Sequence, residues 1–247
     1  MEYKYAKEKS DYSDYSSGRV FHSLSGHPAF PIQLASEIFQ RCLAHRKTIY
    51  NISAPVTLYD PCCGAAYHLS VLAYLHGEFI QEIIASDVAE KAVELAKRNL
   101  GLLDMTDLER RIAEIETMID KYCKDSHKDV LKSAHTLKVK LSNCSNFLVT
   151  RIFQANALSK EEILKNIKPK SVDIIFTDVP YGQHSNWQDS NESNPLWSML
   201  DAFRDVLSTS SIVAVVSNKG QKALHEAYQR IEQFQIGKRR ILILKPI

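Results

Sequence analysis

Five short apolar runs, separated by stretches with helical periodicity, constrain the fold more than any other feature of this sequence. The runs are Val56 to Tyr59, Ile83 to Ala85, Phe147 to Phe153, Val172 to Thr177 and Ser211 to Val216. Their hydrophobicity is continuous rather than alternating, which is typical of parallel strands covered on both faces. Helical patterns fill the intervals, as where Leu34, Ile38 and Cys42 mark one apolar face. We therefore predict an α/β fold with a doubly wound, mostly parallel sheet.

Two segments depart from this alternation. Between residues 104 and 145 the apolar residues recur at helical spacing in two stretches, which predicts an inserted αα-hairpin. Near the C-terminus, Tyr228 to Gln235 and Arg239 to Lys245 flank a short connection that contains Gly237. This pattern predicts an antiparallel pair at the end of a seven-stranded sheet. We expect a single domain over residues 1–247, in which residues 1–50 form an N-terminal extension and a helix.

The composition narrows the class of protein. The chain has 247 residues, of which 45% are hydrophobic and 24% charged, so it can bury a core without disulfides. No apolar run approaches the roughly 18 residues of a membrane span, and no apolar segment near the N-terminus suggests a secretory signal, so we expect a cytoplasmic protein. No histidine or cysteine spacing predicts a metal site. The net charge of +2 neither requires nor excludes a nucleic-acid partner.

A turn of small residues, Asp60 to Ala66, follows the first apolar run and predicts a ligand site. Small residues between a strand and a helix let backbone amides approach a ligand closely. The turn lacks the lysine and the glycines of phosphate-binding loops, which favours a ligand that is not held through a phosphate. The alternative is an ordinary tight turn with an aspartate cap.

Asp87 ends the second run, where α/β nucleoside-binding sheets place a carboxylate against the ribose hydroxyls. Its spacing to Glu90 also fits a capping box for the next helix, and both interpretations stay open. Asn156 follows the third run and could reach an adenine edge or serve as a turn residue. The fourth run ends in Asp178-Val179-Pro180-Tyr181, which combines an acid, a rigid turn and an aromatic stacking face.

The order of these signals resembles that of S-adenosylmethionine-dependent methyltransferases that act on planar amines. Their [D/N/S]-P-P-[Y/F] motif differs from Asp178-Val179-Pro180-Tyr181 by one residue. Further segments are similar to the avilamycin-resistance 23S rRNA methyltransferase family, and the resemblance covers about residues 18 to 245. Those segments are Gly18-Arg19-Val20, Pro28-Ala29-Phe30-Pro31, Glu37-Ile38-Phe39-Gln40-Arg41 and Asp60-Pro61-Cys62-Cys63-Gly64.

The resemblance implies a Rossmann-like class I methyltransferase with S-adenosylmethionine as cofactor. It assigns cofactor-binding roles to Asp60, Pro61, Cys62, Gly64, Ala66, Asp87, Val88, Asn156 and Ala157, and catalytic roles to Asp178, Val179, Pro180 and Tyr181. Asp87 would hold the ribose, Asn156 and Ala157 the adenine, and Tyr181 would stack on the target base. Because methyltransferases usually carry a glycine where Ala66 stands, and alanine adopts positive φ only at a cost, we expect the turn to differ there.

The family implies that the substrate is a guanine of 23S rRNA, and its exocyclic amine is the favoured target, with antibiotic resistance as a role. Asp178 and the Val179 carbonyl would accept the two amine hydrogens. Two alternatives remain: methylation of adenine N6 or of a glutamine amide, and a non-catalytic RNA-binding module. We expect a monomer.

Two basic clusters and one polar loop are candidate RNA contacts, although a solvated charged face would look the same. One cluster is in the second helix of the insertion, Lys124, Lys128, Lys132, Lys138 and Lys140. The other is near the C-terminus, Lys238, Arg239, Arg240 and Lys245. The loop runs from Gly182 to Pro195, beside the proposed chemistry.

Overall fold

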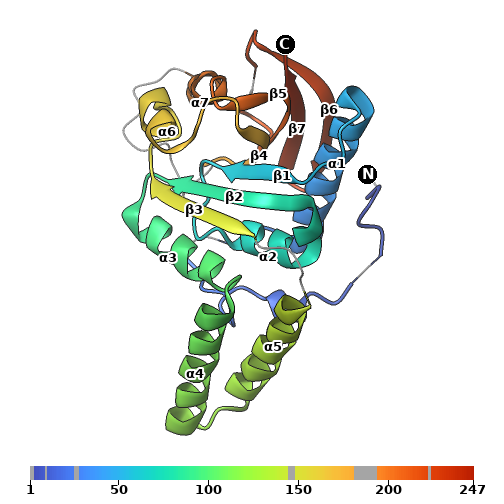
Figure 1. The fold of residues 1–247 in the computed structure, drawn as a ribbon. Coiled ribbons are helices and arrows are strands. Elements are labelled where there is room, and N and C mark those ends of the chain that lie inside the picture. The colour runs from blue at the N-terminus through green and yellow to red at the C-terminus, as the bar shows by residue number, and fades with distance from the viewer. Residues whose placement is uncertain (1–2, 9, 25–27, 144–147, 181–193, 222–223) are drawn as a thin grey trace.

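The computed structural model describes residues 3–8, 10–24, 28–143, 148–180, 194–221 and 224–247 (Figure 1). Seven strands form one sheet in the order β3-β2-β1-β4-β5-β7-β6. They are β1 Val56–Asp60, β2 Ile80–Asp87, β3 Val149–Gln154, β4 Val172–Asp178, β5 Leu207–Asn218, β6 Tyr228–Ile236 and β7 Arg239–Pro246. Strands β1 to β5 are parallel, and β7 runs antiparallel to both β5 and β6. The predicted α/β sheet with an antiparallel C-terminal end is confirmed.

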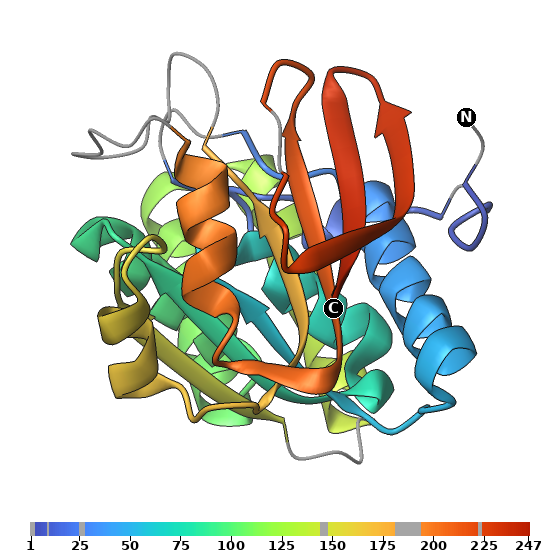
Figure 2. The same ribbon diagram turned by 90° about the horizontal axis from the view of Figure 1, so that it is seen from above.

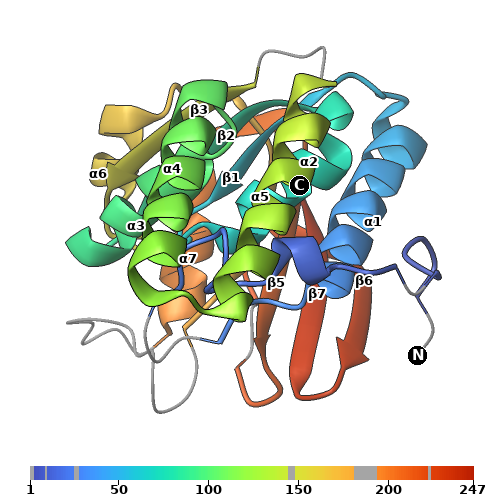
Figure 3. The same cartoon turned by 90° about the horizontal axis from the view of Figure 1, so that it is seen from below.

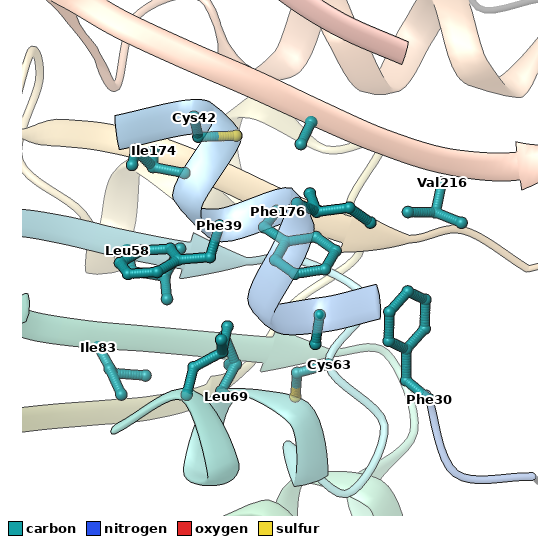
Figure 4. Packing of buried hydrophobic residues seen from close by; sticks show 14 of the residues in the cluster. Phe30, Phe39, Cys42, Leu58, Cys63, Leu69, Ile83, Ile174, Phe176 and Val216 are labelled. Carbon is teal, nitrogen blue, oxygen red and sulfur yellow. The ribbon is translucent and has the colours of Figure 1, made fainter. Parts of the chain in front are cut away.

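Helices cover both faces of the sheet (Figure 2). One face packs against α1 Ile32–Tyr50, α2 Tyr67–His76 and α3 Glu90–Gly101, and the other against α6 Lys160–Asn166 and α7 Pro195–Phe203. Successive strand residues alternate between these two cores, because side chains in a strand point to opposite faces. Figure 4 shows the first core, where Phe30 and Phe176 lie near the carboxyl end of the sheet beside Cys63. The buried side chains on both faces explain the continuous hydrophobicity of the central strands.

The edge strand β3 differs from the expectation of full coverage. Each of its residues is exposed or half-buried, in contrast to the fully buried β1. It pairs only with β2, so its far edge has no neighbouring strand among the described residues. The apolar run from Phe147 to Phe153 therefore predicted a strand correctly, and the expectation that both faces of this strand are covered was wrong.

The insertion forms two antiparallel helices, α4 Met105–Tyr122 and α5 Asp125–Ser142, which project from the α/β body (Figures 1 and 3). Asp104 caps α4, since its side chain accepts the backbone N–H groups of Thr106 and Asp107. Near the body the hairpin is buried on its inner face, through Leu108, Ile112, Ile115, Ala134 and Leu137. Towards the tip the packing thins, and Tyr122 is 53% exposed.

Two short 3-10 helices complete the fold, η1 Ser13–Tyr15 and η2 Gly77–Phe79. The N-terminal segment that contains η1 crosses between α5 and the α/β body (Figure 3). Tyr15 is buried in the same cluster as Tyr67, whose hydroxyl donates to the Tyr15 carbonyl at 2.7 Å. None of the helices in the described residues is long and apolar enough to cross a membrane.

Candidate active site

The carboxyl ends of the parallel strands bring three aspartates to one edge of the sheet. Asp60 ends β1, Asp87 ends β2 and Asp178 ends β4. Since β1 lies between β2 and β4, the sequence-distant turns after these strands are neighbours in space. In open α/β sheets the crevice outside the carboxyl ends of the strands is the usual ligand site. The predicted cofactor and substrate residues therefore converge here.

Two residues of the turn after β1 have a positive backbone φ angle. Gly64 has φ of +54° and Ala66 has φ of +51°, in the left-handed region. The expectation that the turn would differ at Ala66 was wrong, because this alanine adopts the conformation that usually favours glycine. Its methyl group is fully buried in the core under the first turn of α2, and this packing offsets part of the strain.

Asp87 fastens the β1 turn to the β2 turn. One carboxylate oxygen accepts the N–H of Gly64 and the other accepts the N–H of Ala89, each at 2.9 Å. Helix α3 begins at Glu90 with Ala89 as its N-cap and no side-chain capping bond, so the predicted capping box does not form. A carboxylate offers about four lone-pair sites, so a backbone partner does not by itself prevent a contact with ribose hydroxyls, and the ribose role of Asp87 stays a prediction.

Asp60 lies beneath the same turn in a dry environment. It is fully buried, one oxygen accepts the Cys62 N–H at 3.0 Å, and the other lies 3.2 Å from Nε2 of His68. Burial raises the pKa of Asp60 to about 8, although hydrogen bonds from Cys62 and Thr177 oppose the shift. Burial lowers the pKa of His68 to about 4. Burial therefore disfavours the charged form of both side chains.

His68 and Asn99 are two site residues that the sequence pattern did not reveal. His68 belongs to the first turn of α2, where no motif marks it. Asn99 is fully buried in α3, and its side-chain amide donates to the carbonyls of Ala65 and His22 at 2.8 and 3.0 Å, while its oxygen accepts the His22 N–H at 2.7 Å. Asn99 thus ties the N-terminal segment to the turn after β1.

The remaining residues predicted for the cofactor lie at the ends of β2 and β3. Val88 is 38% exposed directly after Asp87, which presents an apolar surface at this edge. Asn156 is half-buried, and its side-chain oxygen accepts the Leu158 N–H at 3.0 Å, as in an Asx turn. Ala157 is buried in the core on the α7 side of the sheet. The turn role of Asn156 is present in the structure, and its adenine role stays a prediction.

The Asp178-Val179-Pro180 segment leaves β4 in an extended direction fixed by two contacts. The N–H of Val179 donates to the Val216 carbonyl at 3.0 Å, and the Pro180 carbonyl accepts from Nε2 of Gln221 at 3.1 Å. Val179 is 1% exposed, and Asp178 is half-buried at the edge of the sheet. Tyr181 and most of the loop from Gly182 to Pro195 lie outside the described residues.

The residues at this edge fit a cofactor with a ribose and a cationic end. No atom of the described residues lies within 4 Å of the position that a Cβ on Gly64 would take, so these residues leave the space above the turn open. The second oxygen of Asp60 has no hydrogen bond in the described part of the chain, although it is buried. Carboxylates without full compensation favour a positively charged ligand. The described residues contain no cluster of side chains suited to a metal ion.

A seven-stranded sheet with this order, a small-residue turn after β1 and an acidic proline turn after β4 define a Rossmann-like methyltransferase. The chain belongs to the AviRa rRNA methyltransferase family, whose model matches residues 1–239. It is 32% identical to the 23S rRNA (guanine(2535)-N(1))-methyltransferase of Streptomyces viridochromogenes, over 98% of this chain and 95% of that protein.

Solved structures show the same relationship. The rRNA methyltransferase aviRa from Streptomyces viridochromogenes superposes with a TM-score of 0.88 at 32% identity, over 99% of this chain and 96% of that one. TrmN from Thermus thermophilus matches with a TM-score of 0.51 at 15% identity, over 90% of this chain and 51% of that one. The second likeness concerns the fold alone.

Proposed function

We propose that this protein transfers a methyl group from S-adenosylmethionine to N1 of a guanine in 23S ribosomal RNA. The observation that carries the proposal is the position of Asp178-Val179-Pro180 at the end of β4, one strand away from the turn after β1. The family supports rRNA as the substrate class, and the Streptomyces relative is named for guanine N1.

The ring nitrogen N1 replaces the exocyclic amine that the sequence favoured as the target atom. N1 of guanine carries a hydrogen, and its lone pair is delocalised into the neighbouring carbonyl. A group at the active site must therefore accept this proton as the N–C bond forms. The Asp178 carboxylate has the chemistry of such a general base, and the Val179 carbonyl would receive the adjacent amine hydrogen. When bound, S-adenosylmethionine supplies an electrophilic methyl group on a sulfonium.

The remaining residues of the site would bind and orient the cofactor and the target base and take no part in the proton transfer. Gly64 and Asp87 would place the cofactor, because an open turn and a carboxylate meet at one point. Tyr181 would hold the flipped base by stacking, which contributes about 1–3 kcal/mol per base in nucleic-acid sites. This alignment is the main catalytic contribution for an in-line displacement.

The test is methylation of 23S rRNA in vitro, followed by nucleoside mass spectrometry. We expect methyl incorporation as N1-methylguanosine in the wild type and its loss in Asp178→Ala at unchanged cofactor binding. A product methylated at the exocyclic amine would correct the target atom. Methyl transfer only to adenine N6 or to a glutamine amide, or no transfer from bound cofactor, would contradict the proposal.

Two further aspects follow from an rRNA substrate. We infer that the protein acts as a monomer in the cytoplasm, and that expression in a sensitive strain raises resistance to an antibiotic that binds the methylated region of the ribosome. Sedimentation analysis measures the first, and minimum inhibitory concentrations with wild type and Asp178→Ala measure the second. Equal resistance with both would show that methylation is not the cause.

A further inference from the structure

Four positively charged side chains gather at the edge of the sheet that carries Asp178. Lys219 follows β5, Lys238 lies in the β6–β7 turn, and Arg239 and Arg240 begin β7. Among the residues that the structure describes, none of the four forms an ion pair. This basic edge is a local excess of positive charge in a chain of nearly balanced net charge.

The strand register places the basic edge beside the proposed target-base site. Asp178 pairs with Val216 of β5, and Ser217, the next residue, pairs with Arg240 of β7. Arg240 therefore lies two strand spacings from Asp178, roughly 10 Å. Figure 2 shows the end of β5 and the β6–β7 turn next to each other at the same edge.

The two arginines carry buried donors that have no acceptor in the described residues. These donors are Nε of Arg239 and both Nε and Nη2 of Arg240. Burying an ionised donor without a partner costs free energy, because its hydration is lost and nothing replaces it. Nε of Arg46 is also buried without an acceptor among the described residues. Most of the other described arginines have a carboxylate partner. They are Arg41, Arg46, Arg98, Arg110, Arg111, Arg151 and Arg204.

Arg239 is also fixed in direction by an aromatic ring that borders the active site. Its guanidinium lies over Phe30 at 5.3 Å from the ring centroid. Phe30 in turn packs on His68, the partner of Asp60, with ring centroids 5.5 Å apart. The arginine is therefore held against the wall of the site, where its remaining donors can meet a ligand.

We propose that Arg239 and Arg240, whose side chains point to opposite faces of β7, bind RNA phosphates on the two sides of this edge next to the methylated nucleotide, assisted by Lys219 and Lys238. The inference rests on the proposed function for the identity of the RNA. Phosphate oxygens are acceptors that match the planar fork of a guanidinium, and neither arginine has a carboxylate partner among the described residues. These four side chains, here called the phosphate clamp, position the RNA backbone while the Asp178 turn contacts the base. Such a division between phosphate contacts and base contacts is common in nucleic-acid recognition.

The lysines of the hairpin are weaker candidates for the same task. Lys128 pairs with Asp125 at 2.9 Å, Lys138 pairs with Glu109 at 2.7 Å, and Lys140 donates to the hydroxyl of Tyr15 at 2.7 Å. The charges of Lys128 and Lys138 are thus paired within the chain, whereas Lys124 and Lys132, which lie in the projecting hairpin, form no ion pair among the described residues. We therefore place the main phosphate contacts on the basic edge and not on α5.

The experiment measures the salt dependence of RNA binding without methyl transfer, using a 23S rRNA fragment and an unrelated RNA of equal length. In R239Q/R240Q the affinity should fall at least tenfold at low salt, and the log–log slope should fall by about 1 to 2, since each phosphate contact contributes about 0.7 to 0.9. Cofactor affinity and melting temperature should change little. The matched control is Arg110→Gln, an exposed arginine of α4 that pairs with Asp107 and should leave the slope unchanged.

A charge-conserving variant separates the clamp from a structural role. R239K/R240K should keep most of the slope of the salt dependence, because lysine still neutralises phosphate. This variant tests the proposal even if R239Q/R240Q does not fold. An unchanged slope in R239Q/R240Q, or a lost slope in R239K/R240K, overturns the proposal. A reduced slope together with no methylation of 23S rRNA by the wild type would support the clamp and refute the proposed function instead.

Discussion

Replacing Asp87 by alanine should weaken both the fold and cofactor binding, because one carboxylate serves two purposes. Two backbone hydrogen bonds of 2.9 Å, from Gly64 and Ala89, disappear. At this half-exposed position water replaces part of each bond, and a net loss of about 1 kcal/mol per bond gives about 2 kcal/mol of unfolding free energy. The ribose contact adds a separate loss. A hydrogen bond to a charged group contributes about 1.5–3 kcal/mol, which corresponds to at least a tenfold rise in Kd.

Calorimetric titration with S-adenosylmethionine and urea unfolding measure the two effects of Asp87→Ala separately. The matched control is Glu90→Ala in the first turn of α3, an exposed acid that would have completed a capping box. This control should leave both quantities nearly unchanged. If Asp87→Ala loses stability but binds the cofactor with wild-type affinity, the carboxylate only fastens the two turns and the ribose assignment is refuted.

Three other perturbations test different parts of the reasoning. Asp178→Ala should abolish most single-turnover methylation with cofactor affinity nearly unchanged, because the carboxylate contacts the nucleophile; a wild-type rate would falsify its role. Ala66→Gly should change the free energy of unfolding in urea by less than about 1 kcal/mol, since relief of left-handed strain offsets the lost methyl group. The control Ala73→Gly, inside α2, should lower it by about 2 kcal/mol. Equal losses in the two variants would mean that Ala66 is unstrained. Burial lowers the pKa of His76 from 6.5 to about 4, so the unfolded state binds more protons and the free energy of unfolding should fall as pH drops from about 6.5 towards 4. His76→Gln should make this decline less steep when unfolding is measured at several pH values. An equally steep decline in the variant would exclude His76 as its source.

The sequence by itself determined the fold class and the order in which the site residues follow one another along the chain. Continuous apolar runs predicted the buried central strands, because a strand covered on both faces has no polar side, whereas the run of β3 belongs to an exposed edge strand. The polar residues that follow each run are then placed at one edge by the parallel arrangement alone. The motif Asp178-Val179-Pro180-Tyr181, in this order after the turn of Asp60 to Ala66, is specific enough to indicate the family before any coordinates.

The tertiary structure decided which partners the site residues have. Asp87 forms bonds to Gly64 and Ala89 instead of a capping box, because α3 starts too late for its side chain to cap the helix. His68 faces Asp60 only through the packing of α2 under the turn, which no local pattern encodes. The pairing of β7 with β5 brings Arg240 within two strand spacings of Asp178, although the two residues are far apart in the chain. Local periodicity predicts elements, whereas such contacts between distant residues depend on the strand order and on how the helices pack.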